Sequence, residues 1–320
     1  MTVKESEVEK TNVDVKVQLE MSDINEQYET TEKLIRKLIN SNCSIEREWA
    51  EMYKIKRNLD TGEINAHQAL KKIGKLDPKT QEMRVFTYII PLYHYLRNAE
   101  YTNLVEMYNL ADVDLIKDNE VIKKSYYNRL VALLASANLS QNNLVGARYL
   151  CSYGIHNTHT DRFIAYSYLN MGNSYIFENY DKAKENFLEG LKHSMDNPDR
   201  KLQITRSLAF LENLWGKENK WINRHSTKQD DLYGQAFELI VKKEHDQAII
   251  ILDQLFNTGL CDNQLGFHYY YLGLIYDHQD FFLKSVEHFK KSGEKFYLEC
   301  PLSELRRLGA DNKFLELLAI

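Results

Sequence analysis

Apolar side chains recur along most of this chain at intervals of three and four residues, with polar side chains between them. The stretch YLNMGNSYIFENYDKAKENFLEGL, residues 168–191, shows this pattern together with regularly spaced small and aromatic residues. Such spacing places the apolar residues on one face of an α-helix, whereas a strand requires strict alternation. The stretch therefore predicts two amphipathic helices joined by a short turn.

The same template returns at several places, and a repeat of this length indicates helix pairs of the tetratricopeptide type. In residues 168–191, Gly172 and Ala183 are the small residues where the two helices approach, and Tyr168, Tyr175 and Phe187 are expected to fill the seam. Three further registers match: Tyr269, Leu272, Gly273, Tyr276, Ser285 and Phe289; Leu232, Ala236, Leu239, Ala248 and Leu252; and Val131, Ala135, Ala147 and Cys151.

The N-terminal third is more degenerate. Residues 26–59 predict two amphipathic helices, and residues 87–110 predict another pair with Pro91 near a helix start or a kink. The chain is thus expected to have four parts. These are a disordered polar tail (1–15), degenerate helical repeats (16–130), tetratricopeptide-like repeats forming a groove (131–300), and C-terminal capping or dimerisation helices (301–320).

The last predicted helix is almost wholly apolar on one side. Such a helix must cover the last repeat or pair with a second subunit, and its apolar residues are Phe314, Leu315, Leu317, Leu318 and Ile320. The predicted fold is all-α, a tetratricopeptide-like superhelix with a C-terminal capping and dimerisation helix. A superhelix of this kind has a concave face that holds an extended peptide or a partner's helix.

The amino-acid composition is consistent with a helical fold and argues against membrane-spanning and nucleic-acid-binding functions. The chain has only 4 Pro and 13 Gly among 320 residues, but 21 Tyr, and its net charge is −5. No apolar run is long enough to span a membrane, and we expect a cytoplasmic protein. Nucleic-acid binding requires concentrated positive charge. The candidate basic residues are loosely spaced and have acidic residues between them: Lys33, Arg36, Lys37, Lys54, Lys56 and Arg57.

The sequence contains few residues in the patterns typical of catalytic or metal-binding sites. HNTHTD, with His156, His159 and Asp161, has ligand-type residues on an expected loop, but without regular zinc spacing. No HExxH, GxSxG or phosphate-binding glycine loop occurs, and Cys151 takes a packing position. We therefore predict neither an enzyme nor a metal or cofactor site.

Polar residues on the expected inner helices are better candidates for binding. Asn173 follows Gly172 at a position that faces the groove, and Ser136 has the same register upstream. An asparagine both donates to and accepts from a peptide backbone. Arg162, three helical turns before Asn173, is able to hold a carboxylate through two hydrogen bonds. The alternative is that Asn173 bridges neighbouring helices and Arg162 is solvated.

Several segments resemble one known family in sequence and in order. YKIKRNL, ALKKIGKL, LYHYLRNAEY, LENLWGKENKWIN, EHFKKSGEKF and NKFLELLAI, with residues 168–191, are similar to the arbitrium receptors (AimR) of temperate Bacillus phages. WGKENKWIN is the most specific of these, because two tryptophans around a charged segment are not a general repeat feature. The resemblance covers residues 15–320.

The resemblance implies a cytoplasmic homodimer that binds a short peptide of about six residues and regulates the lysis–lysogeny decision. It implies that Arg162 and Asn173 bind the peptide. Glu294 would be the acidic partner of the peptide's arginine, and Phe296 the aromatic residue beside it. Three positions depart from the family pattern: Ser136 stands where an asparagine is typical, and Tyr233 and Gly234 replace a polar and an acidic residue. Ser136 and Tyr233 complete the expected peptide site.

Arbitrium receptors begin with a helix-turn-helix domain, and the few polar residues before the repeats here are too short to form one. If this is the natural start, we expect a receptor that acts through contacts with another phage or host regulator; if the sequence is a trimmed form, that domain was removed. Two alternatives remain open: a partner that pairs with a full-length receptor and disables it, and a peptide-independent scaffold that binds a protein. DNA binding through the basic residues above is the least expected function.

Overall fold

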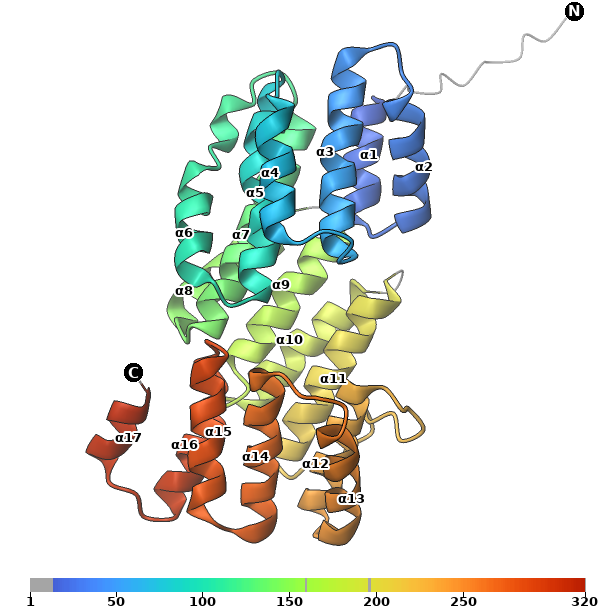
Figure 1. The fold of residues 1–320 in the computed structure, drawn as a ribbon. Helices are drawn as coiled ribbons and strands as arrows, with labels where there is room; N and C mark the ends of the chain where they lie inside the picture. The colour runs from blue at the N-terminus through green and yellow to red at the C-terminus, as the bar shows by residue number, and fades with distance from the viewer. Residues whose placement is uncertain (1–13, 159, 195–196, 320) are drawn as a thin grey trace, which may run out of the picture. The chain divides into compact units, whose positions relative to one another are not determined.

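The computed structural model describes residues 14–158, 160–194 and 197–319, and its regular structure is entirely helical, without strands (Figure 1). The helices in these ranges are α1 (Val15–Ile24), α2 (Tyr28–Ile39), α3 (Ser44–Asp60), α4 (Ala66–Leu76), α5 (Gln81–Arg97), α6 (Tyr101–Leu110), the 3-10 helix η1 (Val113–Leu115), α7 (Glu120–Ser140), α8 (Leu144–Asn157), α9 (Asp161–Ser174), α10 (Tyr180–Lys192), α11 (Pro198–Leu214), α12 (Gln229–Val241), α13 (His245–Phe256), α14 (Asp262–Tyr276), α15 (Gln279–Lys291), α16 (Glu299–Arg307) and α17 (Asn312–Ala319). In the described part of the chain, no helix is long and apolar enough to cross a membrane.

The chain divides into two compact units. Unit 1 runs to Pro91 and includes Leu110–Tyr126, and unit 2 comprises Leu92–Asn109 and the chain from Tyr127 onward. The four-part division expected from the sequence stays a prediction. Most of its polar tail, residues 1–13, lies outside the described residues, and Val15 already belongs to α1.

The core of unit 1 is a stack of buried aromatic rings. Trp49 and Tyr53 of α3 stack with centroids 6.0 Å apart, and Tyr53 stacks on Phe86 of α5 at 4.8 Å. Phe86 in turn stacks on Tyr126 of α7 at 5.0 Å. The four rings are shielded from solvent, so they bury a large apolar area across three helices.

Two basic residues of α3 are occupied within unit 1. Lys56 is buried and its ammonium lies 3.1 Å from Asp23 and 2.7 Å from Asp60. Arg57 pairs with Glu32 at 3.6 Å. A buried, paired lysine does not meet a phosphate backbone, so the structure removes Lys56 from the basic residues considered for nucleic-acid binding.

Unit 2 contains the predicted helix pairs. A Cβ on Gly172 of α9 would lie 2.5 Å from the ring of Phe187 on α10, and a Cβ on Gly273 of α14 would lie 2.5 Å from Phe282 on α15. Only glycine permits contacts this close, and both rings are fully buried. Helices α12 and α13 form another pair, and α17 packs on α16 at the C-terminal end. The predicted all-α, tetratricopeptide-like fold is confirmed.

Some positions differ from the sequence pattern. Tyr276 is 54% exposed and does not fill the seam between α14 and α15, where Phe282 lies instead. Tyr168 is half-buried and stacks on His193 at 6.0 Å. Pro91 lies inside α5 and not near its start, and the alternative of a kink at Pro91 stays a prediction. The sequence pattern predicted correctly that Phe187 enters the α9–α10 interface, but not that Phe282 faces Gly273 in the α14–α15 interface.

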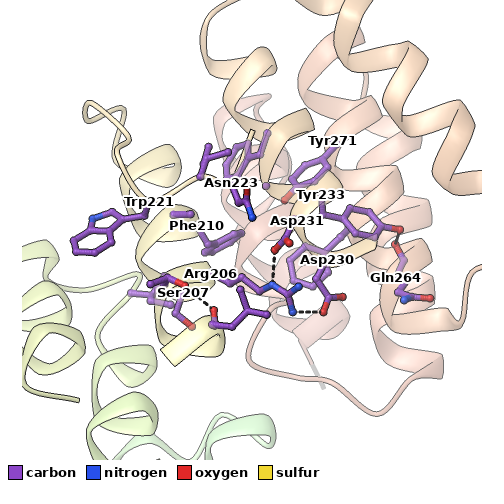
Figure 2. A pocket seen from close by; sticks show the side chains of 18 of the residues that line it. Arg206, Ser207, Phe210, Trp221, Asn223, Asp230, Asp231, Tyr233, Gln264 and Tyr271 are labelled. Atoms are coloured by element: carbon purple, nitrogen blue, oxygen red, sulfur yellow. Dashed lines mark hydrogen bonds and ion pairs between the residues drawn. The ribbon is translucent and has the colours of Figure 1, made fainter. Parts of the chain in front are cut away.

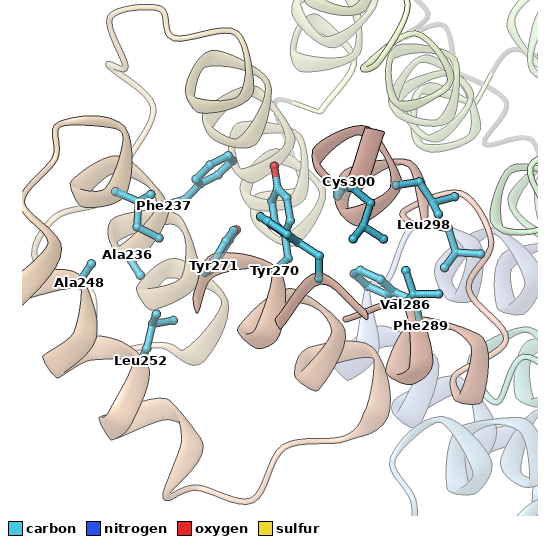
Figure 3. Packing of buried hydrophobic residues seen from close by; sticks show 14 of the residues in the cluster. Ala236, Phe237, Ala248, Leu252, Tyr270, Tyr271, Val286, Phe289, Leu298 and Cys300 are labelled. Atoms are coloured by element: carbon cyan, nitrogen blue, oxygen red, sulfur yellow. The ribbon is translucent and has the colours of Figure 1, made fainter. Parts of the chain in front are cut away.

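The C-terminal repeats share one apolar core (Figure 3). Phe237 of α12 stacks on Tyr271 of α14 with centroids 4.9 Å apart, and Phe289 of α15 lies in the same cluster. Leu298 and Cys300, at the start of α16, extend the cluster. This packing joins α12, α14 and α15 in one apolar core.

The segment between α11 and α12 is irregular and contains WGKENKWIN. Asn219 is buried, and its amide donates to the carbonyl of Ala209 at 2.7 Å and to the side-chain oxygen of Asn213 at 2.8 Å. The Trp215 indole donates to the carbonyl of Ile176 at 2.8 Å. These bonds satisfy polar groups that a loop without regular structure would otherwise leave unpaired, and they hold the segment against α11.

Candidate functional site

A polar cavity of about 300 Å³ opens within unit 2, and we call it the polar cavity. Its lining comes from the end of α5, from α7 and α9, and from the loop between α15 and α16. It brings together four of the residues predicted to bind peptide, namely Ser136, Asn173, Glu294 and Phe296. Residues separated by more than 150 positions therefore share one site.

Ser136 on α7 is part of a hydrogen-bond chain with α9. Asn170 donates from Nδ2 to Ser136 Oγ at 3.0 Å, and the hydroxyls of Ser136 and Tyr166 are 2.6 Å apart. Asn170 and Tyr166 line the cavity but were missed in the sequence analysis. Their signal was available, because residues 166, 170 and 173 are spaced by four and three and so share one face of α9.

Asn173 presents an unused acceptor. Its Oδ1 is buried and has no hydrogen-bond partner within the described ranges. Leaving such an oxygen unsatisfied costs about 1–3 kcal/mol, so native proteins rarely keep one without a reason. A ligand that brings an N–H donor into the polar cavity would recover that energy.

Glu294 supplies the cavity's carboxylate from the loop after α15. Burial raises its pKa to about 7, even though hydrogen bonds from the N–H groups of Phe296 and Tyr297 and from the Ser140 hydroxyl partly oppose the rise. The Phe296 N–H lies 3.0 Å from Glu294 Oε1. A carboxyl with such a pKa is only partly ionised at neutral pH, and a nearby cation would favour its charged form.

The loop that carries Glu294 is tied to the end of α7. Lys295 and Phe296 both donate their backbone N–H to the carbonyl of Ser140, at 2.8 and 3.2 Å, and Gln141 donates to the carbonyl of Gly293 at 3.0 Å. Gly293 has φ +75°, a left-handed conformation that glycine adopts without strain. The loop geometry is therefore set by backbone contacts between distant parts of unit 2.

Phe296 forms a buried wall of the polar cavity. Its ring centroid lies 5.0 Å from that of Phe177 and 5.1 Å from that of Tyr297. Its assignment to peptide binding stays a prediction, but the structure places it beside Glu294, as expected.

Tyr233 lines a different cavity, of about 310 Å³, which we call the aromatic cavity (Figure 2). Its lining comes mainly from α11, α12 and α14 and includes Phe210, Phe267 and Tyr271. The phenol of Tyr233 donates to the carbonyl of Gln264 at 3.3 Å. Tyr233 is thus not brought together with Ser136, Asn173 and Glu294.

Arg162 lines neither cavity among the residues that the structure describes. It lies half-buried in the first turn of α9, at the opposite end from Asn173. Eleven residues of α-helix span roughly 16 Å, more than an arginine side chain bridges. Its role in binding stays a prediction.

The HNTHTD segment does not form a metal centre in the described ranges, where no cluster of three potential ligands occurs. His156 lies in the last turn of α8, not in a loop, with its ring nitrogen 2.7 Å from the carbonyl of Ser152. Asp161 is the first residue of α9 and pairs with His193 at 2.7 Å. His159 is outside the described residues.

The residues expected to form a dimer divide into two sets on α17. Leu315 is buried and Leu318 packs beside it against the apolar core of unit 2. Phe314 and Leu317 are 45% and 67% exposed. Ile320 lies outside the described residues, and the dimerisation assignment stays a prediction.

The fold and the polar cavity define an all-α repeat protein with a ligand-sized site. Residues 3–307 match the family described as AimR transcriptional regulator-like. The chain is 37% identical over 314 residues to the AimR transcriptional regulator of Bacillus phage SPbeta, covering 97% of this chain and 81% of that protein. It is 36% identical to the AimR transcriptional regulator of Bacillus phage phi3T, covering 94% and 79%.

Solved structures agree with the sequence matches. A selenomethionine structure of phAimR has a TM-score of 0.81 at 35% identity, covering 96% of this chain and 80% of that one. A structure of phAimR with a ligand has a TM-score of 0.84 at 35% identity, covering 92% and 88%. This chain belongs to the AimR transcriptional regulator-like family, and the resemblance predicted from its sequence is confirmed.

Proposed function

We propose that this chain is a cytoplasmic arbitrium-type receptor, which binds a short phage-encoded peptide in the polar cavity and thereby regulates the lysis–lysogeny decision. Membership of a family of transcriptional regulators supports a regulatory role. The similarity to phAimR solved with a ligand supports a binding role.

The observation that carries the proposal is the unpaired, buried Oδ1 of Asn173 in a cavity that also contains Glu294. A peptide offers backbone N–H donors for the first group and, through arginine or lysine, a cation for the second. A charge-assisted hydrogen bond to Glu294 would contribute about 1.5–3 kcal/mol. These are the two chemistries that a peptide ligand supplies together.

The spacing of Asn173 and Arg162 along α9 is compatible with a short peptide ligand. Asn173 and Arg162 lie roughly 16 Å apart along the helix axis. An extended hexapeptide spans roughly 20 Å. A peptide of about six residues is therefore able to reach from Asn173 to Arg162, which would hold a carboxylate.

The proposed receptor is a homodimer through α17, where Phe314 and Leu317 are exposed. The same surface supports a second candidate function, pairing with a full-length receptor to form mixed dimers. Co-expression with a tagged full-length relative and pull-down tests it. Recovery of mixed dimers that are lost on Phe314→Glu supports this function, and recovery of homodimers alone contradicts it.

Isothermal titration calorimetry with a panel of hexapeptides, including sequences that carry an arginine as a partner for Glu294, tests peptide binding. We expect saturable binding to the wild type and at least tenfold weaker binding to Asn173→Ala and to Glu294→Gln. Asn186→Ala on α10 and Glu185→Gln serve as matched controls, because both residues lie outside the polar cavity. No binding across the panel would overturn the proposal.

A further inference from the structure

A cavity of about 340 Å³ lies within unit 1, and we call it the lysine cavity. Its lining comes from the end of α2, one face of α3 and the last turns of α4. On α3, Glu51 and Ile55 are four residues apart, and on α4, Lys72 and Lys75 are three apart, so each pair shares a helical face. Among the described residues, the lysine cavity shares none of its lining with the polar cavity, so the function proposed above gives it no role.

The deeper part of the lysine cavity is apolar. Ile55 of α3 is 7% exposed, and Ile39 of α2 and Leu76 of α4 are half-buried. Aliphatic side chains from three helices therefore line one hollow. An occupant that covers them removes apolar surface from water, and an aliphatic side chain is the group that gains most from this burial.

The rim of the lysine cavity is basic. Lys54 of α3 and Lys72 and Lys75 of α4 are exposed, and none of the three forms an ion pair within the described ranges. Lys56, by contrast, is buried and held by two carboxylates. Glu51 is the only acidic side chain among the described residues that line the cavity, so the lining carries an excess of positive charge.

This basic rim is a local departure from the charge of the chain, which is −5 overall. Lys75 lies in the last turn of α4, where the helix dipole favours a cation, so its position alone has an explanation within the fold. Lys54 lies in the interior of α3, where no such effect applies. Cations gathered around one hollow repel one another, and an anionic occupant relieves that repulsion.

The combination of an apolar interior and a lysine rim discriminates between two anionic partners. A nucleic-acid backbone supplies phosphates for the lysines but no group that fills an aliphatic hollow. Proteins that bind single strands stack the bases on aromatic side chains, and none occurs among the described residues that line this cavity. A protein segment with carboxylates on either side of an aliphatic residue matches both parts of the lining.

We propose that the lysine cavity docks an acidic amphipathic segment of a protein partner. An aliphatic side chain of that segment packs on Ile55, and its carboxylates pair with the three lysines of the rim. Exposed ion pairs contribute little individually, so the aliphatic side chain supplies much of the affinity and the lysines supply the preference for an acidic partner. The inference goes beyond the peptide-receptor function and stands without it.

Fluorescence anisotropy of labelled dodecapeptides with the full chain tests the proposal. The first probe consists of glutamate and alanine with a leucine at every third or fourth position, which makes an acidic amphipathic helix. In the second probe serine replaces each leucine, and in the third glutamine replaces each glutamate. We expect the first probe to bind saturably and roughly tenfold more tightly than either of the others, because the second lacks the aliphatic group and the third lacks the carboxylates.

Two variants with the same change of charge identify the site. The rim variant carries three substitutions: Lys54→Gln, Lys72→Gln and Lys75→Gln. The matched control neutralises three exposed lysines of unit 1 that do not line the cavity: Lys37→Gln, Lys71→Gln and Lys79→Gln. The rim variant should bind the first probe roughly tenfold more weakly than the wild type, and the control should bind it almost unchanged. Circular dichroism verifies that both variants fold.

The outcomes decide whether the lysine cavity is a docking site and for which partner. Binding of the first probe that the rim variant loses and the control keeps supports the proposal. Equal losses in both variants, equal binding of the serine probe, or no saturable binding of the first probe overturns it. A labelled DNA duplex is the remaining arm: binding of the duplex that is tighter than that of the first probe, and lost in the rim variant, assigns the lysines to nucleic acid and also overturns the proposal.

Discussion

Asn170 Nδ2 donates to Ser136 Oγ at 3.0 Å, and this bond ties α9 to α7 within the wall of the polar cavity. The Ser136 hydroxyl also lies 2.6 Å from that of Tyr166 and 3.2 Å from the carbonyl of Ala132. Asn173, one turn further along α9, has a buried Oδ1 that finds no hydrogen-bond partner among the described residues. The site thus combines a satisfied network, which orders the helices, with one open acceptor.

Ser136→Ala should destabilise the chain by about 1–2 kcal/mol, because it removes the acceptor of the buried Asn170 amide. Urea unfolding followed by circular dichroism measures this change. Ser303→Ala is the control, since that hydroxyl donates to the carbonyl of Cys300 on its own helix. Equal stability of the two variants would show that the network contributes little.

Binding of an arginine-bearing peptide should weaken as the pH falls from 8 to 6. Burial raises the pKa of Glu294 to about 7, so the carboxyl of the free site takes up a proton as the pH falls through this range. The arginine of the peptide must displace that proton to bind. The pKa values of the neighbouring phenols Tyr101 and Tyr297 are raised by burial, and both stay neutral. Calorimetry in buffers of different ionisation enthalpy should detect proton release near pH 7, absent in Glu294→Gln.

The unliganded protein should lose stability as the pH rises from about 4.5 to 7. The folded chain holds the Glu294 proton more tightly than the unfolded chain, so the unfolded state binds fewer protons in this window. Glu294→Gln should therefore match the wild type near pH 4.5 and exceed its stability by on the order of 1–3 kcal/mol at pH 8. A constant difference across the range, measured by urea unfolding, would contradict this assignment.

Two glycine-to-alanine substitutions should act with opposite sign. Gly172→Ala places a Cβ 2.5 Å from the fully buried ring of Phe187 and should destabilise by about 1–3 kcal/mol. Gly234→Ala meets no atom within 4 Å and should stabilise α12 by up to about 1 kcal/mol. Thermal unfolding of both variants checks the signs, and equal effects would indicate that α9 and α10 adjust to the added carbon.

Phe314→Glu combined with Leu317→Glu should convert the proposed dimer to a monomer without unfolding it. Both side chains are exposed on α17, so the change places charge in the interface and leaves the core intact. Light scattering coupled to size-exclusion chromatography measures the mass. Leu315→Ala should instead destabilise the chain by about 2–5 kcal/mol, because Leu315 is buried.

Part of the site was accessible from the sequence. The register of Asn173 after Gly172 predicted a polar residue at the site, and Tyr166 and Asn170 share its helical face. Glu294 was identified through family resemblance, not through physical reasoning. Its position beside Ser140 depends on hydrogen bonds between the α15–α16 loop and the end of α7, which no local pattern predicts.

The repeating spacing of apolar and small residues, by itself, determined the helices and the faces by which they pair, because side-chain periodicity follows from local backbone geometry. Gly172 shows this, because it faces the predicted ring of Phe187 on the next helix. Only the tertiary structure decided that Tyr233 and Asn173 line separate cavities, and that Tyr297 contributes to both. A cavity is the space that distant side chains leave unfilled when helices pack, so its walls depend on rotamers and contacts that sequence spacing does not specify.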